Sequence, residues 1–165
     1  MEGYKMSADM FLKIEGVEGE AVDHKHGKEI DVLAWSWGMS QSGSMHVGGG
    51  GGAGKVAVQD ISLTKYVDRS TPNLINTCCT GKHYPKATIT VRKAGDKAVE
   101  YFIITMTDVI VTSISTGGSG GEDRLTENVS LNFAKVEVQY TPQTKDGSAG
   151  ASIDTGFNIE ENTEI

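Results

Sequence analysis

The sequence predicts a mainly β, single-domain barrel with one short α-helix and extended glycine-rich loops. About seven runs alternate apolar and polar residues with a period of two, which is typical of strands that bury one face. Turn residues separate these runs, and a helical pattern occurs once. A chain of 165 residues suffices for one well-buried core and is short for two. We therefore expect one domain over residues 9–159, with a leader segment at 1–8 and a frayed tail at 160–165.

The expected strands follow the chain in order. At residues 10–15, Met10, Leu12 and Ile14 alternate with Phe11, Lys13 and Glu15, and residues 87–92 alternate cleanly between apolar and polar side chains. The run at 98–114 is apolar at both parities, so we expect it to be buried on both faces for part of its length. In the run at 30–38, alternation places Leu33, Trp35 and Trp37 on one face. The opposite face is then formed by Val32, Ala34 and Ser36.

Two runs change the parity of their apolar residues partway along. Val58 is followed by Ile61, and Phe133 is followed by Val136. Because a one-residue slip turns every later side chain to the other face, a bulge or bend near Gln59 and near Ala134 explains both changes. Such bends are expected where a sheet curls, so the pattern favours a closed or nearly closed barrel.

The helix is expected at residues 71–81. Ser70 or Thr71 is suited to cap its start, Pro72 suits the first helical position, and Gly81 suits its end. Its narrow apolar stripe is expected to consist of Leu74, Ile75 and Cys78.

Charge and hydropathy exclude several classes of partner. The net charge is −7, and the 15 Lys and Arg residues are scattered, so no basic stripe is available to neutralise phosphates. The longest apolar stretch, near residues 101–104, is far too short to span a bilayer. The first residues lack the apolar core of a secretory signal. We expect no nucleic-acid binding, no membrane insertion, synthesis in the cytoplasm, and reduced thiols at the adjacent Cys78 and Cys79.

The glycine-rich segment before Lys55 resembles the start of a phosphate-binding loop. Residues 49–55 fit the spacing, but Val56 supplies no hydroxyl for magnesium and a strand is expected where a helix should begin. Segment 40–54 is better explained as a long hairpin tip. Its five consecutive glycines are costly to order unless another surface holds them, which suggests an oligomer contact.

No grouping of residues predicts catalysis or a cofactor. His24 and His26 lack a third metal ligand nearby, so we expect them in a surface loop. Glu122 and Asp123 are adjacent and would point to opposite faces of a strand, which is unsuitable for acid–base work on one bond. A solvated or interfacial loop is expected there, in which Arg124 is available to pair with a carboxylate of a neighbouring subunit.

Several short segments, in a fixed order along the chain, resemble those of a known protein family. Composition and periodicity do not provide this information. The first segment is Ile30-Asp31-Val32-Leu33-Ala34-Trp35-Ser36-Trp37-Gly38. Further segments are Met39-Ser40-Gln41-Ser42-Gly43, Val58-Gln59-Asp60, Thr64-Lys65-Tyr66, Ser70-Thr71-Pro72-Asn73-Leu74, Gly81-Lys82-His83-Tyr84-Pro85, Ser115-Thr116-Gly117-Gly118 and Leu125-Thr126-Glu127-Asn128-Val129. Together they span nearly the whole chain, and in this order it resembles the Hcp family of type VI secretion tube proteins.

The resemblance implies a specific assembly. Family members are barrels of two β-sheets with a helix at the side, and six copies form a ring. The rings stack into a hollow tube that a contractile sheath propels and a VgrG-type spike tips. Some members carry small effector proteins in the ring. The resemblance further implies a non-enzymatic protein without a cofactor, made in the cytoplasm and exported through the type VI apparatus without a cleaved signal.

Three groups of residues are candidates for contacts in such an assembly. If Trp35 and Trp37 are buried, Ser36 projects the other way, and we predict that it lines the lumen and contacts effectors. A place for Ser36 at a seam between subunits is the alternative. The predicted ring-stacking loop contains Ser42, Ser44, Met45, His46 and Val47, and the predicted inter-subunit loop contains Glu122, Asp123 and Arg124.

Three other classes of protein are compatible with parts of the pattern. A phage-like tail tube protein would share the architecture. A monomeric barrel that encloses a small ligand would remain a monomer and contain an apolar cavity. An enzyme would depend on His24, His83 or Cys78, whose spacing supports no catalytic arrangement.

Overall fold

A computed structural model describes residues 8–43, 54–94 and 98–165 of the chain. Within these residues it contains one α-helix and ten strands. The elements are β1 (Ala8–Ile14), β2 (Ile30–Ser36), β3 (Met39–Gln41), β4 (Val56–Val58), β5 (Ile61–Tyr66), α1 (Thr71–Thr80), β6 (His83–Lys93), β7 (Glu100–Thr116), β8 (Thr126–Tyr140), β9 (Ile153–Asn158) and β10 (Thr163–Glu164).

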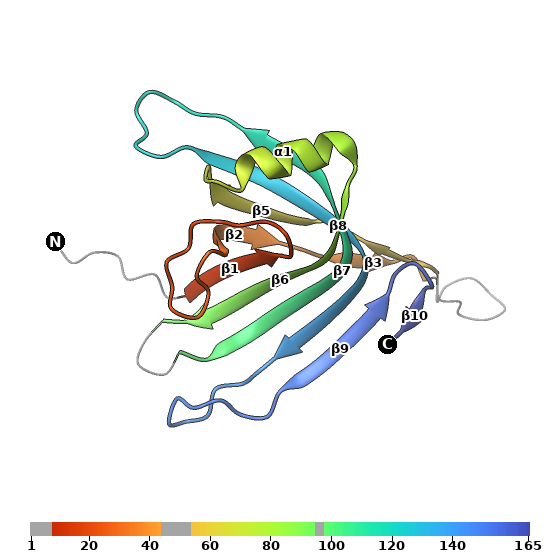
Figure 1. Cartoon of the computed structure of the whole chain (residues 1–165). Coiled ribbons are helices and arrows are strands. Elements are labelled where there is room, and N and C mark those ends of the chain that lie inside the picture. Colours follow the sequence, from red (N-terminus) through yellow and green to blue (C-terminus); the bar gives the residue numbers. More distant parts are fainter. Residues whose placement is uncertain (1–7, 44–53, 95–97) are drawn as a thin grey trace.

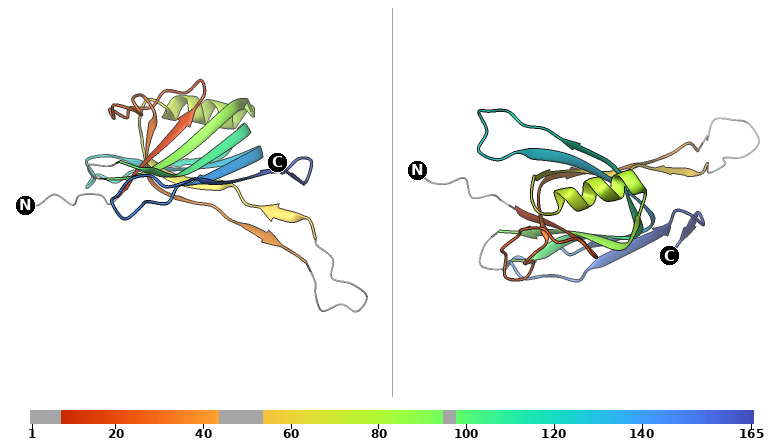
Figure 2. Two further views of the ribbon diagram at one scale, coloured as in Figure 1. Left: turned by 90° about the horizontal axis from the view of Figure 1, so that it is seen from below. Right: turned by 45° about the horizontal axis from the view of Figure 1, so that its top comes forward.

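Six strands form a closed antiparallel barrel in the order β8-β5-β2-β1-β6-β7, because β7 also pairs with β8 (Figure 1). The predicted barrel is therefore confirmed. Strands β9 and β10 extend the same sheet beyond β8, whereas β3 and β4 pair only with each other and form a second, two-stranded sheet. We call β3 and β4 the ribbon. It projects away from the barrel (Figure 2, left).

Apolar side chains fill the interior of the barrel. Each barrel strand contributes at least one side chain that is at most 1% exposed. Examples, one from each strand, are Leu12, Ile30, Ile61, Ile89, Ile104 and Leu131. Burying a side chain of this size contributes about 1.5–3 kcal/mol. Buried apolar side chains of all six strands thus belong to one core cluster.

Both predicted bends are present. Between the pairs Ser36↔Ser62 and Met39↔Val58, two residues of one strand face three of the other, at Gln59 to Ile61. Near Ala134, the buried side chains change parity on both β8 and its partner β7, where Asp108 has a φ of 56°. The Ala134 carbonyl accepts a hydrogen bond from the N–H of Ile159, just after β9, at 2.8 Å.

The expected alternation in β2 is wrong at Val32. The register of β2 against β5 shifts between Val32 and Ala34, so the strand has a bulge at Leu33. As a result Val32 is 2% exposed and belongs to the core, while Leu33 is only half-buried. Beyond the bulge the predicted alternation holds, because Trp35 packs against the core and Ser36 is exposed.

Helix α1 begins and ends where the sequence predicted. Gly81 follows it with a φ of 71°, and its N–H donates to the Thr77 carbonyl at 2.9 Å. The predicted stripe is partly wrong, because Ile75 is 41% exposed. The buried residues are Thr71, Leu74 and Thr77, with Cys78 half-buried. Ser70 occupies the capping position, but its hydroxyl donates to Asp68 and makes no cap bond.

The C-terminal residues pair with the sheet, in contrast to the frayed tail that we expected. Thr163 and Glu164 form β10 against Asn158 and Phe157 of β9. The Ile165 N–H donates to the Gly156 carbonyl at 3.2 Å. In the part of the chain that the structure describes, no helix is long and apolar enough to cross a membrane.

Candidate functional site

Ser36 lies at the end of β2 in a row of serines that crosses four neighbouring strands. It pairs with Ser62 on β5, Ser62 pairs with Ser130 on β8, and Ser130 pairs with Ser113 on β7. The next row, one pleat further along, contains Ala34, Thr64, Asn128 and Ser115. We call these eight residues the hydroxyl face. They line a shallow hollow on the outside of the barrel.

Internal hydrogen bonds organise the hydroxyl face. Thr64 Oγ1 donates to Asn128 Oδ1 at 2.8 Å, and the Ser130 hydroxyl bonds those of Ser113 and Thr112. The residues that line the hollow include no ionisable side chain. In a chain with a net charge of −7, a neutral surface of small side chains is well suited to hydrogen bonding with a polypeptide and unsuited to binding ions.

Two tryptophans fix the orientation of Ser36. Trp35 stacks on Phe102, with ring centroids 5.8 Å apart and planes at 16°. The Trp37 ring packs against Phe133 at 6.1 Å. Its Nε1–H donates to the Gln59 carbonyl at 3.0 Å. Because both rings turn towards the core, Ser36 between them faces outward, as the sequence predicted.

The predicted ring-stacking loop is only partly described. Ser42 is exposed just beyond β3, whereas Ser44, Met45, His46 and Val47 lie outside the described residues. A strand follows Lys55, as predicted, where a phosphate-binding loop would be followed by a helix. Residues of the ribbon, β8 and β9 line an apolar groove, which includes Met39, Val56, Val58, Val136, Val138 and Phe157.

The predicted inter-subunit loop connects β7 and β8, and it lies on the opposite side of the molecule from the ribbon (Figure 1). Glu122, Asp123 and Arg124 are all exposed. The Arg124 guanidinium sits 3.7 Å from the centroid of the Tyr66 ring. A cation that stacks on an aromatic ring in this way already has a partner in its own chain.

The expectation for the two neighbouring histidines is wrong for His26. His24 is exposed, but His26 is 8% exposed and stacks on Phe11 at 4.4 Å. Its Nδ1 and Nε2 lie 2.8 Å from Glu29 and 2.7 Å from Glu100. No local pattern in the sequence indicates this contact, because Glu100 follows 74 residues later. Among the described residues, no group of three potential ligands is arranged for a metal ion.

A buried cluster of charges, which the sequence pattern did not lead us to expect, lies between β5, β8 and α1. Lys65 and Glu127 pair directly across β5 and β8, and both side chains are fully buried. Lys65 Nζ lies 2.5 Å from Glu127 and 3.1 Å from Asp68. Thr71, at the start of α1, donates to Glu127 at 2.6 Å. A signal was available, since Lys65 continues the inward parity of Ile61 and Leu63.

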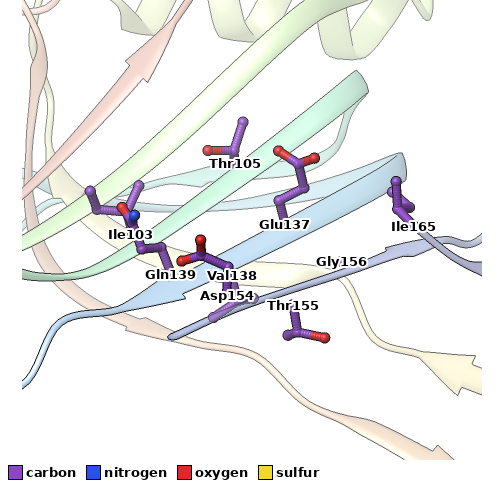
Figure 3. A pocket seen from close by; sticks show the side chains of 9 residues that line it. All are labelled: Ile103, Thr105, Glu137, Val138, Gln139, Asp154, Thr155, Gly156 and Ile165. Carbon is purple, nitrogen blue, oxygen red and sulfur yellow. The ribbon is translucent and has the colours of Figure 1, made fainter. Parts of the chain in front are cut away.

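A second shallow hollow lies on the outer face of β7, β8 and β9, where Figure 3 shows its side chains. Glu137 and Asp154 supply its carboxylates, and Thr105, which pairs with Glu137 across β7 and β8, and Thr155 supply its hydroxyls. Its lining contains no histidine, cysteine or serine. Elsewhere, the His83 ring contacts Asp108 at 2.8 Å, and in the described structure no hydrogen bond joins it to Cys78.

Comparison with known proteins agrees with these features. The family model for the type VI secretion system effector Hcp matches residues 11–140. Protein hcp1 of Pseudomonas aeruginosa is 64% identical over 161 residues, which cover 96% of this chain and 99% of that protein. The crystal structure of Hcp1 from Salmonella typhimurium has a TM-score of 0.81 at 40% identity and covers 97% of this chain and 100% of its own. A solved type six secretion system protein has a TM-score of 0.90 at 29% identity, covering 95% and 99% of the two chains.

The fold and these matches define a type VI secretion tube protein. The match covers most of the chain and includes the β2 segment on which the resemblance rested. The chain belongs to the Hcp family.

Proposed function

We propose that the chain is the repeating, non-enzymatic subunit of the type VI inner tube, and that the hydroxyl face lines the lumen of its ring. Six copies form the ring, and the ribbon of each copy contacts the next ring. The domain that assembles in this way spans residues 9–159. A contractile sheath and a VgrG-type spike are the partners that such a tube requires. The protein is made in the cytoplasm and leaves through the apparatus without a cleaved signal.

The neutral hydroxyl face is the observation that carries the lumen assignment. A lumen that carries different small proteins has to bind them weakly and then release them. Serine, threonine and asparagine side chains donate and accept hydrogen bonds without a fixed charge, and each neutral hydrogen bond contributes only about 0.5–1.5 kcal/mol. Because Ser36, Ser62, Ser113 and Ser130 are small, cargo is able to approach the backbone of all four strands.

The contacts between copies are proposed for parts of the chain outside the closed barrel. The ribbon, with Ser42 and the predicted residues Ser44 to Val47 beyond it, supplies the ring-to-ring contact. Met39 at the start of the ribbon is 52% exposed and lines an apolar groove with Val56 and Val58, and a continuous apolar surface of this kind favours a partner over solvent. The loop with Glu122 and Asp123 supplies a contact between subunits. Arg124 holds this loop against β5 of the same chain by its contact with the Tyr66 ring.

The first test is the solution mass of the purified protein by light scattering, with negative-stain images of the same fraction. We expect six times the chain mass of 17.6 kDa and rings with an open centre. A monomer that persists at high concentration would contradict the proposal.

The second test is the substitution Ser36→Arg. A long cationic side chain should occupy the lumen, so retention of a co-expressed effector should fall about tenfold, which corresponds to about 1.4 kcal/mol, while the ring mass is unchanged. Thr80→Arg, on an exposed position at the end of α1, is the matched control and should retain the effector. Loss of the ring itself would place Ser36 at a subunit seam, and intact rings with full retention would contradict the lumen assignment.

A further inference from the structure

The ribbon leaves the barrel through a junction that is held by several hydrogen bonds. Trp37 Nε1–H donates to the Gln59 carbonyl at 3.0 Å. The Gln59 N–H donates to the Gly38 carbonyl at 2.9 Å. These bonds therefore join the two segments of the ribbon at the point where they leave β2 and β5.

Asp60 connects this junction to the rest of the barrel. Its Oδ1 accepts a hydrogen bond from Asn132 Nδ2 on β8 at 2.8 Å. Its Oδ2 accepts one from Thr112 Oγ1 on β7 at 2.7 Å. One carboxylate thus joins the start of β5 to two other strands, and both of its oxygens are used.

The carboxylate of Asp60 joins two bulges. Asp60 lies in the segment where three residues face two at the base of the ribbon. Thr112 lies where β7 shifts register against β8, between Val111 and Ser113. A bulge bends its strand and increases the local twist, so two linked bulges fix the direction in which the chain leaves the sheet.

We propose that Asp60 is a positioning residue that sets the direction of the ribbon. The inference rests on the proposed function, in which the ribbon makes the ring-to-ring contact. Asp60 acts through the ribbon and need not touch the next ring. Among the described residues its hydrogen-bond partners, Thr112 and Asn132, are neutral, so the role depends on geometry and not on charge.

The test compares Asp60→Ala with Asp60→Asn in the full chain. An asparagine is able to accept from Asn132 and donate to the Thr112 hydroxyl, which keeps both bonds, whereas alanine loses both. Hydrogen exchange should be about tenfold faster for the Gln59 amide and the ribbon amides in Asp60→Ala, as expected for two lost hydrogen bonds. In Asp60→Asn the rates should stay within about twofold of the wild type. Glu15→Ala removes an exposed carboxylate elsewhere on the barrel and is the matched control.

A second measurement separates the ribbon from the ring. Light scattering should give the wild-type ring mass for both Asp60 variants. Sedimentation at high concentration should show weaker association between rings for Asp60→Ala alone. Thr112→Val removes one of the two donors to Asp60. Its exchange rates and its association between rings should lie between those of the wild type and Asp60→Ala, so this variant replaces Asp60→Ala in the test if Asp60→Ala does not fold.

The outcomes are distinguishable. Unchanged exchange at the ribbon in Asp60→Ala would overturn the inference, and so would an Asp60→Asn variant as impaired as Asp60→Ala. If the wild-type protein forms no rings, the proposed function fails, while the exchange rates still decide whether Asp60 positions the ribbon.

Discussion

At the scale of single residues, the buried cluster around Lys65 controls how α1 joins the barrel. Lys65 and Glu127 are fully buried, and Glu127 also accepts hydrogen bonds from Thr71 and from Thr116 at 2.9 Å. Thr71 begins the helix and Thr116 ends β7. The charged pair therefore connects four elements, β5, β8, α1 and β7, and its hydrogen-bond partners compensate for the cost of removing both charges from water.

Removing Lys65 should leave two carboxylates, Glu127 and Asp68, without their cation. We expect Lys65→Met to lower the free energy of unfolding by about 3–5 kcal/mol, because an uncompensated charge remains buried. Denaturant unfolding measures this value. Lys13→Met, at an exposed position of β1, is the control and should change stability by less than about 0.5 kcal/mol. A cost below about 1 kcal/mol for Lys65→Met would contradict the role of the pair.

A second ion pair, between Asp23 and Arg92, makes the stability of the fold depend on pH. The hydrogen bond from Arg92 holds the pKa of Asp23 well below its ordinary value, against the opposing effect of desolvation. Since the pKa is lower in the folded state, the pair stabilises the fold above the unfolded pKa of about 3.9. This contribution is lost as the pH falls further towards the folded pKa.

Asp23→Asn should therefore lower the free energy of unfolding by about 1–3 kcal/mol at neutral pH and weaken its dependence on pH between about 5 and 2. Unfolding curves across this range measure both effects. Asp123→Asn, in the exposed glycine-rich loop, should leave the curve unchanged. Parallel pH curves for the wild type and Asp23→Asn would show that the ion pair does not contribute.

At the scale of elements, α1 illustrates how local sequence signals determine a boundary. Pro72 and Gly81 bracket the helix where the sequence predicted. Gly81 adopts a left-handed conformation, and a Cβ added there would have no atom within 4 Å. Its requirement is therefore one of backbone conformation and not of space.

Gly81→Ala should destabilise the protein by about 1–2 kcal/mol, the cost of a left-handed backbone for a residue with a Cβ. Gly81→Asn should cost less, because asparagine tolerates this conformation. Thermal or denaturant unfolding of both variants measures the difference, with the exposed Thr80→Ala as control. Equal stability of the alanine and asparagine variants would contradict this explanation.

At the scale of the whole molecule, closure of the barrel decides which parts remain for assembly. Because β7 pairs with both β6 and β8, the six barrel strands have no free edge. The ribbon and the β9–β10 extension lie outside that closure, and together with β8 they line the apolar groove. These parts, together with the hydroxyl face, are the surfaces on which the proposed ring and tube depend.

The sequence by itself determined the features that follow from local pattern. Period-two alternation predicted the strands, and the parity changes at Gln59 and Ala134 predicted a curled sheet, because a strand keeps its alternation unless a residue is added. The alternation around Trp35 and Trp37 was enough to predict that Ser36 faces outward. The ordered segments indicated the family.

Only the tertiary structure decided what depends on residues far apart in the chain. The serine row joins four strands, Lys65 meets Glu127 62 residues later, and His26 meets Glu100 after 74. Leu33 gave no local sign of its bulge, because the pairing with β5 sets it. The sequence alone indicates only a loop residue at Asp60. In the folded barrel, β7 and β8 place Thr112 and Asn132 beside its two carboxylate oxygens. Local spacing fixes which face a side chain takes, whereas its contacts depend on which strands become neighbours when the barrel closes.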